Sequence, residues 1–241
     1  MLIRAVKRYY STAQVSLIQD GRGYLQYCMN HGINTRSTVF RGTFYELYVK
    51  QFVESNLYAK GLIKCGGAYD NGVDIMGYWD LLPFYKLSKQ IGGSSLGKIH
   101  SKSLVNHAKE LESSLKKTVS LQNDINLLIQ CKNTKKRLGA QVVRELSGIM
   151  EYHKFKKNST FMFIVSPHPL TLQAISQLDK STFAMISLAI SALVNNNIAN
   201  HYDFDQWQGG VLTSVYINSH ARNLLSGLNI EQQLGTFIKD I

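Results

Sequence analysis

The apolar positions of this chain form two kinds of pattern, short continuous runs and amphipathic stretches. Residues 73–79, 127–131, 161–165 and 211–217 are apolar runs rich in β-branched and aromatic side chains, which is typical of strands. Residues 44–57, 142–150 and 170–178 carry apolar side chains at intervals of three and four, which predicts amphipathic helices. The run 183–194 contains two serines and falls short of the about 20 apolar residues that span a bilayer, so we expect a buried element there and no membrane span.

The order of these elements is helix, strand, insert, strand, helix, strand, helix. This order predicts an α/β fold in which helices cover both faces of a mixed β-sheet. No repeat or linker divides the chain, so we expect one domain over residues 41–241 after a polar N-terminal extension, residues 13–40. Thr43 and Glu46 have the spacing of a capping box at the start of the first helix.

A basic insert at about residues 80–125 separates two of the predicted strands. We expect a helix over residues 104–121 within it. Loops of this length are often functional or disordered. Its scattered lysines indicate a solvated face, and an arm that contacts nucleic acid is the alternative.

The first residues are amphipathic and free of acids. Arg4, Lys7 and Arg8 precede the first acidic residue, Asp20, and a serine follows at position 11. Such segments are typical of mitochondrial import signals. We therefore predict a presequence over residues 1–12 and a location in the mitochondrial matrix, with an ordinary basic arm as the alternative.

Positive charge is concentrated in the middle of the chain. The whole sequence has 27 Lys and Arg against 16 Asp and Glu, a net charge of +11, which favours a polyanionic partner or an anionic membrane surface. Eight of these cations lie between residues 126 and 160, against two acids, so we expect a phosphate backbone to be bound there, with Lys135, Lys136 and Arg137 as contacts. The three cysteines and seven histidines lack the spacing of a disulfide framework or a zinc site.

Four polar side chains lie next to apolar segments, where each would need a partner. Side chains alternate along a strand, so Gln130 and Lys132 would share one side and Cys131 would face the core on the other. Asp74 lies in an apolar run, and Glu46 lies beside the apolar face of its helix, where an uncompensated carboxylate is costly. Each has an ordinary explanation alone: Glu46 can cap a helix, and Asp74 can pair with a lysine.

Three segments that contain these residues resemble the Mrr-like branch of the PD-(D/E)xK phosphodiesterase superfamily. They are Phe-Tyr-Glu at 44–46, the segment 67–75 with Gly-Val-Asp at 72–74, and Ile-Gln-Cys-Lys at 129–132. Gln130 stands where the superfamily name has Asp or Glu, although glutamine is usual in this branch. The N-terminus and the length also resemble the fungal mitochondrial "required for respiratory growth" proteins of the seventh type, which are themselves similar to this branch.

The resemblance implies a restriction-endonuclease-like fold and a metal-dependent nuclease that maintains the mitochondrial genome, with DNA favoured over RNA. It implies that Asp74, Gln130 and Glu46 hold Mg²⁺ or Mn²⁺ and that Lys132 orients or deprotonates the attacking water. Two alternatives remain. One is a nucleic-acid-binding protein that keeps the fold without turnover, and the other is a structural respiratory factor, which leaves the co-occurrence of the four residues unexplained.

Overall fold

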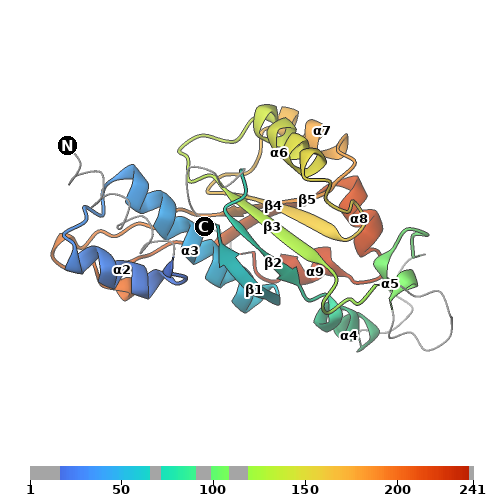
Figure 1. The fold of residues 1–241 in the computed structure, drawn as a ribbon, viewed down its shortest axis with the longest axis horizontal. Coiled ribbons are helices and arrows are strands. Elements are labelled where there is room, and N and C mark those ends of the chain that lie inside the picture. Colours follow the sequence, from blue (N-terminus) through green and yellow to red (C-terminus); the bar gives the residue numbers. More distant parts are fainter. Residues whose placement is uncertain (1–16, 66–71, 91–98, 109–118, 239–241) are drawn as a thin grey trace.

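A six-stranded mixed sheet forms the centre of the part of the molecule that the computed structural model describes, which is residues 17–65, 72–90, 99–108 and 119–238 (Figure 1). The strands follow one another in space as they do in the chain: β1 Ala59–Lys64, β2 Ile75–Trp79, β3 Asn126–Cys131, β4 Thr160–Ser166, β5 Ala184–Ile190 and β6 Leu212–Ile217. The neighbours β3, β4 and β5 are parallel, and the other pairs are antiparallel. The predicted α/β class with a mixed sheet is confirmed.

Helices cover both faces of this sheet (Figure 1). The helices are α2 Gly21–Asn30, α3 Thr38–Asn56, α4 Leu82–Gln90, α5 Leu104–His107, α6 Ala140–Tyr152, α7 Leu172–Asp179, α8 Ser219–Leu225 and α9 Ile230–Gly235, with short 3-10 turns η1 Ile198–Asn200 and η2 Phe204–Gln206. Apolar side chains of α6 and α7 pack on one face, and those of α3, α4, α8 and α9 pack on the other. Within the described residues, no helix is both long enough and apolar enough to cross a membrane.

Strand β3 shows the alternation that its sequence predicts. Leu127, Ile129 and Cys131 belong to the core layer that contains α3, whereas Leu128 belongs to the layer under α6 and α7. β4 and β5 are buried along their whole length, as expected of central parallel strands covered on both faces.

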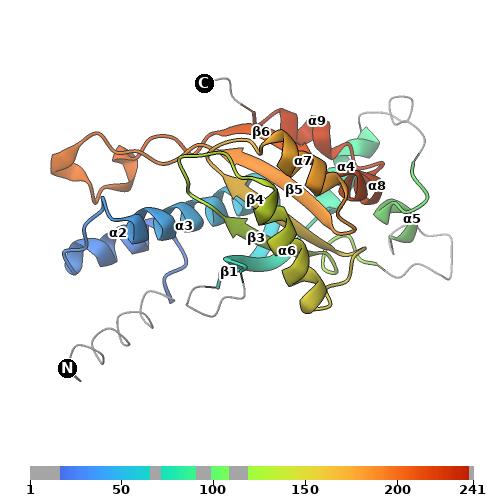
Figure 2. The same ribbon diagram turned by 90° about the horizontal axis from the view of Figure 1, so that it is seen from above.

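A third core lies beyond one end of the sheet, in what we call the α2–α3 lobe: residues 17–47 with the β5–β6 connection, residues 191–211 (Figure 2). Its core consists of Tyr24, Leu25, Cys28, Phe40, Phe44 and Leu47, packed against Leu193, Tyr202, Phe204 and Trp207. The connection returns to the sheet through Gly210, which has φ +67°. A Cβ there would lie 2.1 Å from the Tyr48 ring, so only glycine permits this approach.

Some local predictions are wrong. Helix α3 begins at Thr38, and its N-cap is Ser37, whose Oγ accepts a hydrogen bond from Phe40 N at 3.1 Å. Thr43 therefore lies inside the helix, and the capping box with Glu46 does not form. The prediction of a helix over residues 104–121 is also wrong, because α5 ends at His107 and the extended Ala108 forms a β-bridge with Val119. The presequence 1–12 and residues 109–118 of the insert lie outside the described residues.

Candidate active site at the ends of β1, β2 and β3

The antiparallel arrangement of the first three strands brings the end of β1, the start of β2 and the end of β3 to one edge of the sheet. Asp74 lies at this edge, directly before β2. Its carbonyl accepts a hydrogen bond from Cys65 N at 2.7 Å, and its amide donates to Ile129 O at 3.0 Å. Backbone hydrogen bonds on both sides therefore hold the position of the Asp74 side chain.

Asp74 and Gln130 are in direct contact and almost fully buried, with 8% and 3% of their surfaces exposed. Gln130 Nε2 donates a hydrogen bond to Asp74 Oδ2, and Cys131 N donates to the same oxygen at 2.6 Å. Hydrogen bonds from such donors offset the cost of burying a carboxylate. The structure thus brings together two of the four predicted site residues.

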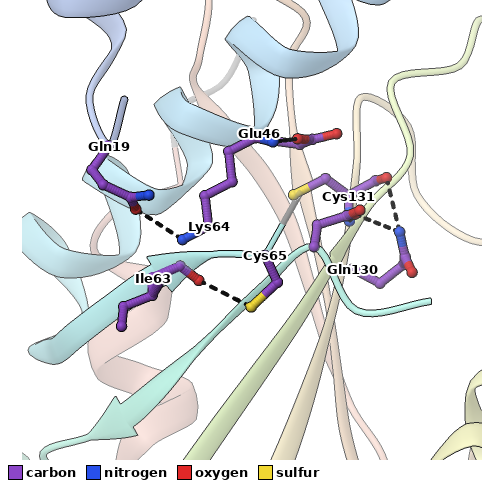
Figure 3. A network of polar contacts seen from close by, with 8 residues as sticks. Gln19, Glu46, Ile63, Lys64, Cys65, Gln130 and Cys131 are labelled. Atoms are coloured by element: carbon purple, nitrogen blue, oxygen red, sulfur yellow. Dashed lines mark hydrogen bonds and ion pairs between the residues drawn. The ribbon is translucent and has the colours of Figure 1, made fainter. Parts of the chain in front are cut away.

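Glu46 reaches the same edge from α3, where it pairs with a residue that the sequence analysis missed (Figure 3). Lys64 Nζ, at the end of β1, lies 3.0 Å from Glu46 Oε2, and the two side chains are 8% and 21% exposed. Lys64 N also donates to Gln19 Oε1 at 2.9 Å. Lys64 escaped the sequence analysis because Lys60, Gly61 and Lys64 interrupt the apolar pattern of β1.

The Cys131 thiol lies among all of these charges (Figure 3). Burial raises the pKa of this thiol well above its ordinary value, and the negative charges of Asp74 and Glu46 raise it further. The positive charges of Lys64 and Lys132 act in the opposite direction. Cys131 belongs to the core, as predicted.

Lys132 follows directly after β3 and is half-buried. Its backbone amide donates to Val165 O at 2.8 Å, which extends the pairing of β3 with β4. Within the described part of the chain, its ammonium forms no ion pair or hydrogen bond. The predicted phosphate contacts Lys135, Lys136 and Arg137 lie on the loop that follows, and all three are exposed.

The oxygen donors at this edge are of the kind that a hard cation binds, but they are few. Among the described residues, no group of three or more His, Cys, Asp or Glu side chains could hold a metal ion. Asp74 and Gln130 supply a carboxylate and an amide in contact, while the Glu46 carboxylate is held by Lys64. Mg²⁺ binds oxygen ligands and keeps several waters, but the Gln130 atom that meets Asp74 is the amide nitrogen. The Gln130 oxygen would reach a cation beside Asp74 only if the amide turned over and gave up this hydrogen bond.

Comparison with known proteins places the chain in one family. The model of the family described as "Required for respiratory growth protein 7" matches residues 37–225. Relatives named "Required for respiratory growth protein 7, mitochondrial" include those of Vanderwaltozyma polyspora, 30% identical over 85% of this chain and 84% of the relative, and Kluyveromyces lactis, 32% identical over 82% and 83%. The Saccharomyces cerevisiae relative is 28% identical over 86% of this chain and 87% of its own length.

No solved structure matches the chain at a significant level. The family match spans most of the described residues, from the N-cap of α3 to the end of α8, and includes Glu46, Lys64, Asp74, Gln130 and Lys132. The chain therefore belongs to the "required for respiratory growth protein 7" family.

Proposed function

We propose that this protein is a Mg²⁺- or Mn²⁺-dependent nuclease that acts on nucleic acid in the mitochondrial matrix, with DNA as the favoured substrate. The observation that carries the proposal is the contact of Asp74 with Gln130 beside Lys132, at an edge of the sheet where the following loop is basic. The relatives are named mitochondrial and required for respiratory growth. A nuclease that maintains the mitochondrial genome would be needed for respiration indirectly.

In this proposal Asp74 and the side-chain oxygen of Gln130 would hold the cation, which requires the Gln130 amide to turn over and release the hydrogen bond that Nε2 donates to Asp74 Oδ2. The cation would polarise a phosphoryl oxygen and lower the pKa of water. Gln130 contributes no charge, so we expect weaker binding than at a site with two carboxylates, and the phosphodiester supplies further anionic oxygens.

In this proposal Lys132 is the general base or the group that orients the attacking water. It follows Gln130 by two residues, and its ammonium has no competing ion-pair partner within the described residues. A cation there would also offset charge that develops on the phosphorus in the transition state. Lys64 adds a second cation at the same edge, and its ion pair with Glu46 keeps that carboxylate in place. Glu46 would become a ligand of the cation only by leaving Lys64.

A nucleic-acid-binding protein without turnover is the second candidate, and one observation favours it. Glu46 forms an ion pair with Lys64, and Gln130 carries no charge, so two of the three predicted ligands would add little negative charge to attract a cation. Such a site can retain the fold and the basic surface and yet bind the cation too weakly for catalysis.

The two candidates are separated by assays of the purified mature chain on circular plasmid DNA and on RNA, with Mg²⁺, Mn²⁺ or a chelator. The nuclease proposal expects metal-dependent cleavage that falls by about 10²-fold or more in Asp74→Ala and Lys132→Ala. Exposed controls of matched charge are Glu145→Ala and Lys86→Ala, which should cleave like the wild type.

Cleavage that is unchanged in Asp74→Ala and Lys132→Ala would rule out the proposed site. Binding that weakens with salt, without cleavage under any metal condition, would support the non-catalytic candidate. If the protein neither binds nor cleaves DNA or RNA, both candidates are ruled out.

A further inference from the structure

A groove lined by both polar and apolar side chains runs along the α2–α3 lobe, outside the candidate active site, with Leu193, Val194 and Trp207 as its apolar part. It has a volume of about 470 Å³. One wall comes from residues 34–41, at the start of α3, and carries Arg36 and Arg41. The other wall comes from the β5–β6 connection and carries Asn195, Asn196 and Asn197. A shallower hollow shares Asn196 and Asn197 and continues to two glutamines at positions 206 and 208.

The groove is rich in hydrogen-bonding groups and lacks acids. No carboxylate belongs to the lining of either hollow within the described residues. Arg36 and Arg41 are exposed, and in that same part of the chain neither guanidinium forms an ion pair. Asn195 and Asn197 each accept a backbone hydrogen bond from the residue two positions ahead, at 2.7 and 3.2 Å, which stiffens this wall.

The basic loop after β3 contacts the part of α3 that carries Arg41 of the groove wall. Asn133 Nδ2 donates a hydrogen bond to Arg41 O at 3.1 Å, so this loop rests on the first part of α3. Lys132 lies one residue before this contact, and Lys135 lies two residues after it. Exposed cations of the loop and of the groove wall are therefore on segments that are in direct contact.

We propose that this groove binds an unpaired stretch of polynucleotide whose phosphate backbone continues into the candidate active site, an inference that rests on the proposed function. Guanidinium groups pair with phosphate oxygens in two parallel hydrogen bonds. Side-chain amides donate to and accept from base edges, which are accessible when the bases are unpaired. The volume lies in the range of small-ligand pockets, roughly 300–1,000 Å³, which suits nucleotides of a single strand rather than a duplex.

Fluorescence anisotropy with the mature full-length chain tests this inference. The probes are labelled single-stranded DNA, single-stranded RNA and duplex DNA of mixed sequence, each titrated at several salt concentrations without divalent metal. We expect tighter binding of one or both single strands than of the duplex. The double substitution Arg36→Gln with Arg41→Gln should weaken single-strand binding by about 10-fold or more and lower the salt slope by about 1.4, since each phosphate contact on a single strand contributes about 0.7.

A matched control removes two exposed cations outside the groove and outside residues 126–160, on α4 and at the end of α7: Lys86→Gln with Lys180→Gln. It should bind like the wild type, and circular dichroism should show that both double variants fold. If the wild type binds nucleic acid and the groove variant binds equally well, or if duplex is preferred, the groove inference is overturned while the proposed function stands. If the wild type binds no probe, the groove inference is overturned, and the cleavage assay with Mg²⁺ or Mn²⁺ decides the proposed function separately.

Discussion

Replacement of Gln130 by glutamate is a direct test of the contact on which the candidate site depends. The substitution would place a second carboxylate against Asp74 and remove the amide that donates to Asp74 Oδ2. Two unit charges about 3 Å apart repel by about 5 kcal/mol at an effective dielectric constant of about 20. Loss of a hydrogen bond to a charged acceptor costs roughly 1.5–3 kcal/mol. Uptake of one proton by the two carboxylates limits the combined cost of the repulsion and the lost hydrogen bond. We therefore expect Gln130→Glu to lower the free energy of unfolding by about 3–5 kcal/mol at neutral pH.

The pH dependence of this loss has a definite sign. Repulsion and burial raise the pKa of the introduced carboxyl above its value of about 4.3 in the unfolded chain. The folded variant then binds more protons than the unfolded chain between those two pKa values. The destabilisation is therefore complete above the raised pKa and shrinks as the pH falls toward about 4.3.

Urea unfolding followed by tryptophan fluorescence measures the effect, because Trp79 is fully buried in the core. Gln141→Glu, which adds the same charge at an exposed position of α6, is the control and should change stability by less than about 0.5 kcal/mol. The double variant Asp74→Asn with Gln130→Glu restores one carboxylate and one amide and should recover part of the loss. Equal stability of Gln130→Glu and Gln141→Glu at neutral pH would refute the contact.

The same variant reports on the cation. Two adjacent carboxylates bind a hard divalent ion more tightly than a carboxylate and an amide. Millimolar Mg²⁺ should therefore raise the stability of Gln130→Glu more than that of the wild type, by mass action on the folded state. A Mg²⁺ effect of the same size on the Gln141→Glu control would show that the ion binds elsewhere.

Three further predictions concern the surroundings of the site. Lys64→Met leaves the Glu46 carboxylate half-buried without its cation and should lower the free energy of unfolding by about 1–3 kcal/mol. The loss should be smaller when Lys64→Met is combined with Glu46→Gln, and equal losses in the single and double variants would contradict the ion pair. Gly210→Ala forces a side chain onto an aromatic ring at positive φ and should cost more than about 2 kcal/mol, whereas Gly148→Ala, in the open on α6, should stabilise by about 0.5–1 kcal/mol in urea unfolding. Cys65 should react first with iodoacetamide in the native protein, because the other two described cysteines are buried and burial raises the pKa of their thiols. Mass spectrometry reads the order of modification, and simultaneous modification of all three cysteines would contradict this prediction.

The local sequence was sufficient to predict the central strands and the helices around them. β3, β4 and β6 and helices α6 and α7 lie where apolar runs and amphipathic spacing predict them, because each element buries a regular set of side chains. β1 was missed because it is an edge strand, where few positions must be apolar. The start of α3 was misplaced because a weak capping signal at Thr43 competed with Ser37, which makes the actual cap.

The residue types at the candidate site could also be selected from the sequence, since a carboxylate or an amide beside a buried strand needs a partner wherever it lies. Their partners could not be predicted, because pairing depends on which strand ends meet at one edge. Only the tertiary structure places Lys64 against Glu46, joins Gln130 to Asp74, and connects the loop after β3 to Arg41. These contacts join residues 18 to 92 positions apart, and it is the antiparallel arrangement of the first three strands and the packing of α3 beside them that bring such distant residues together.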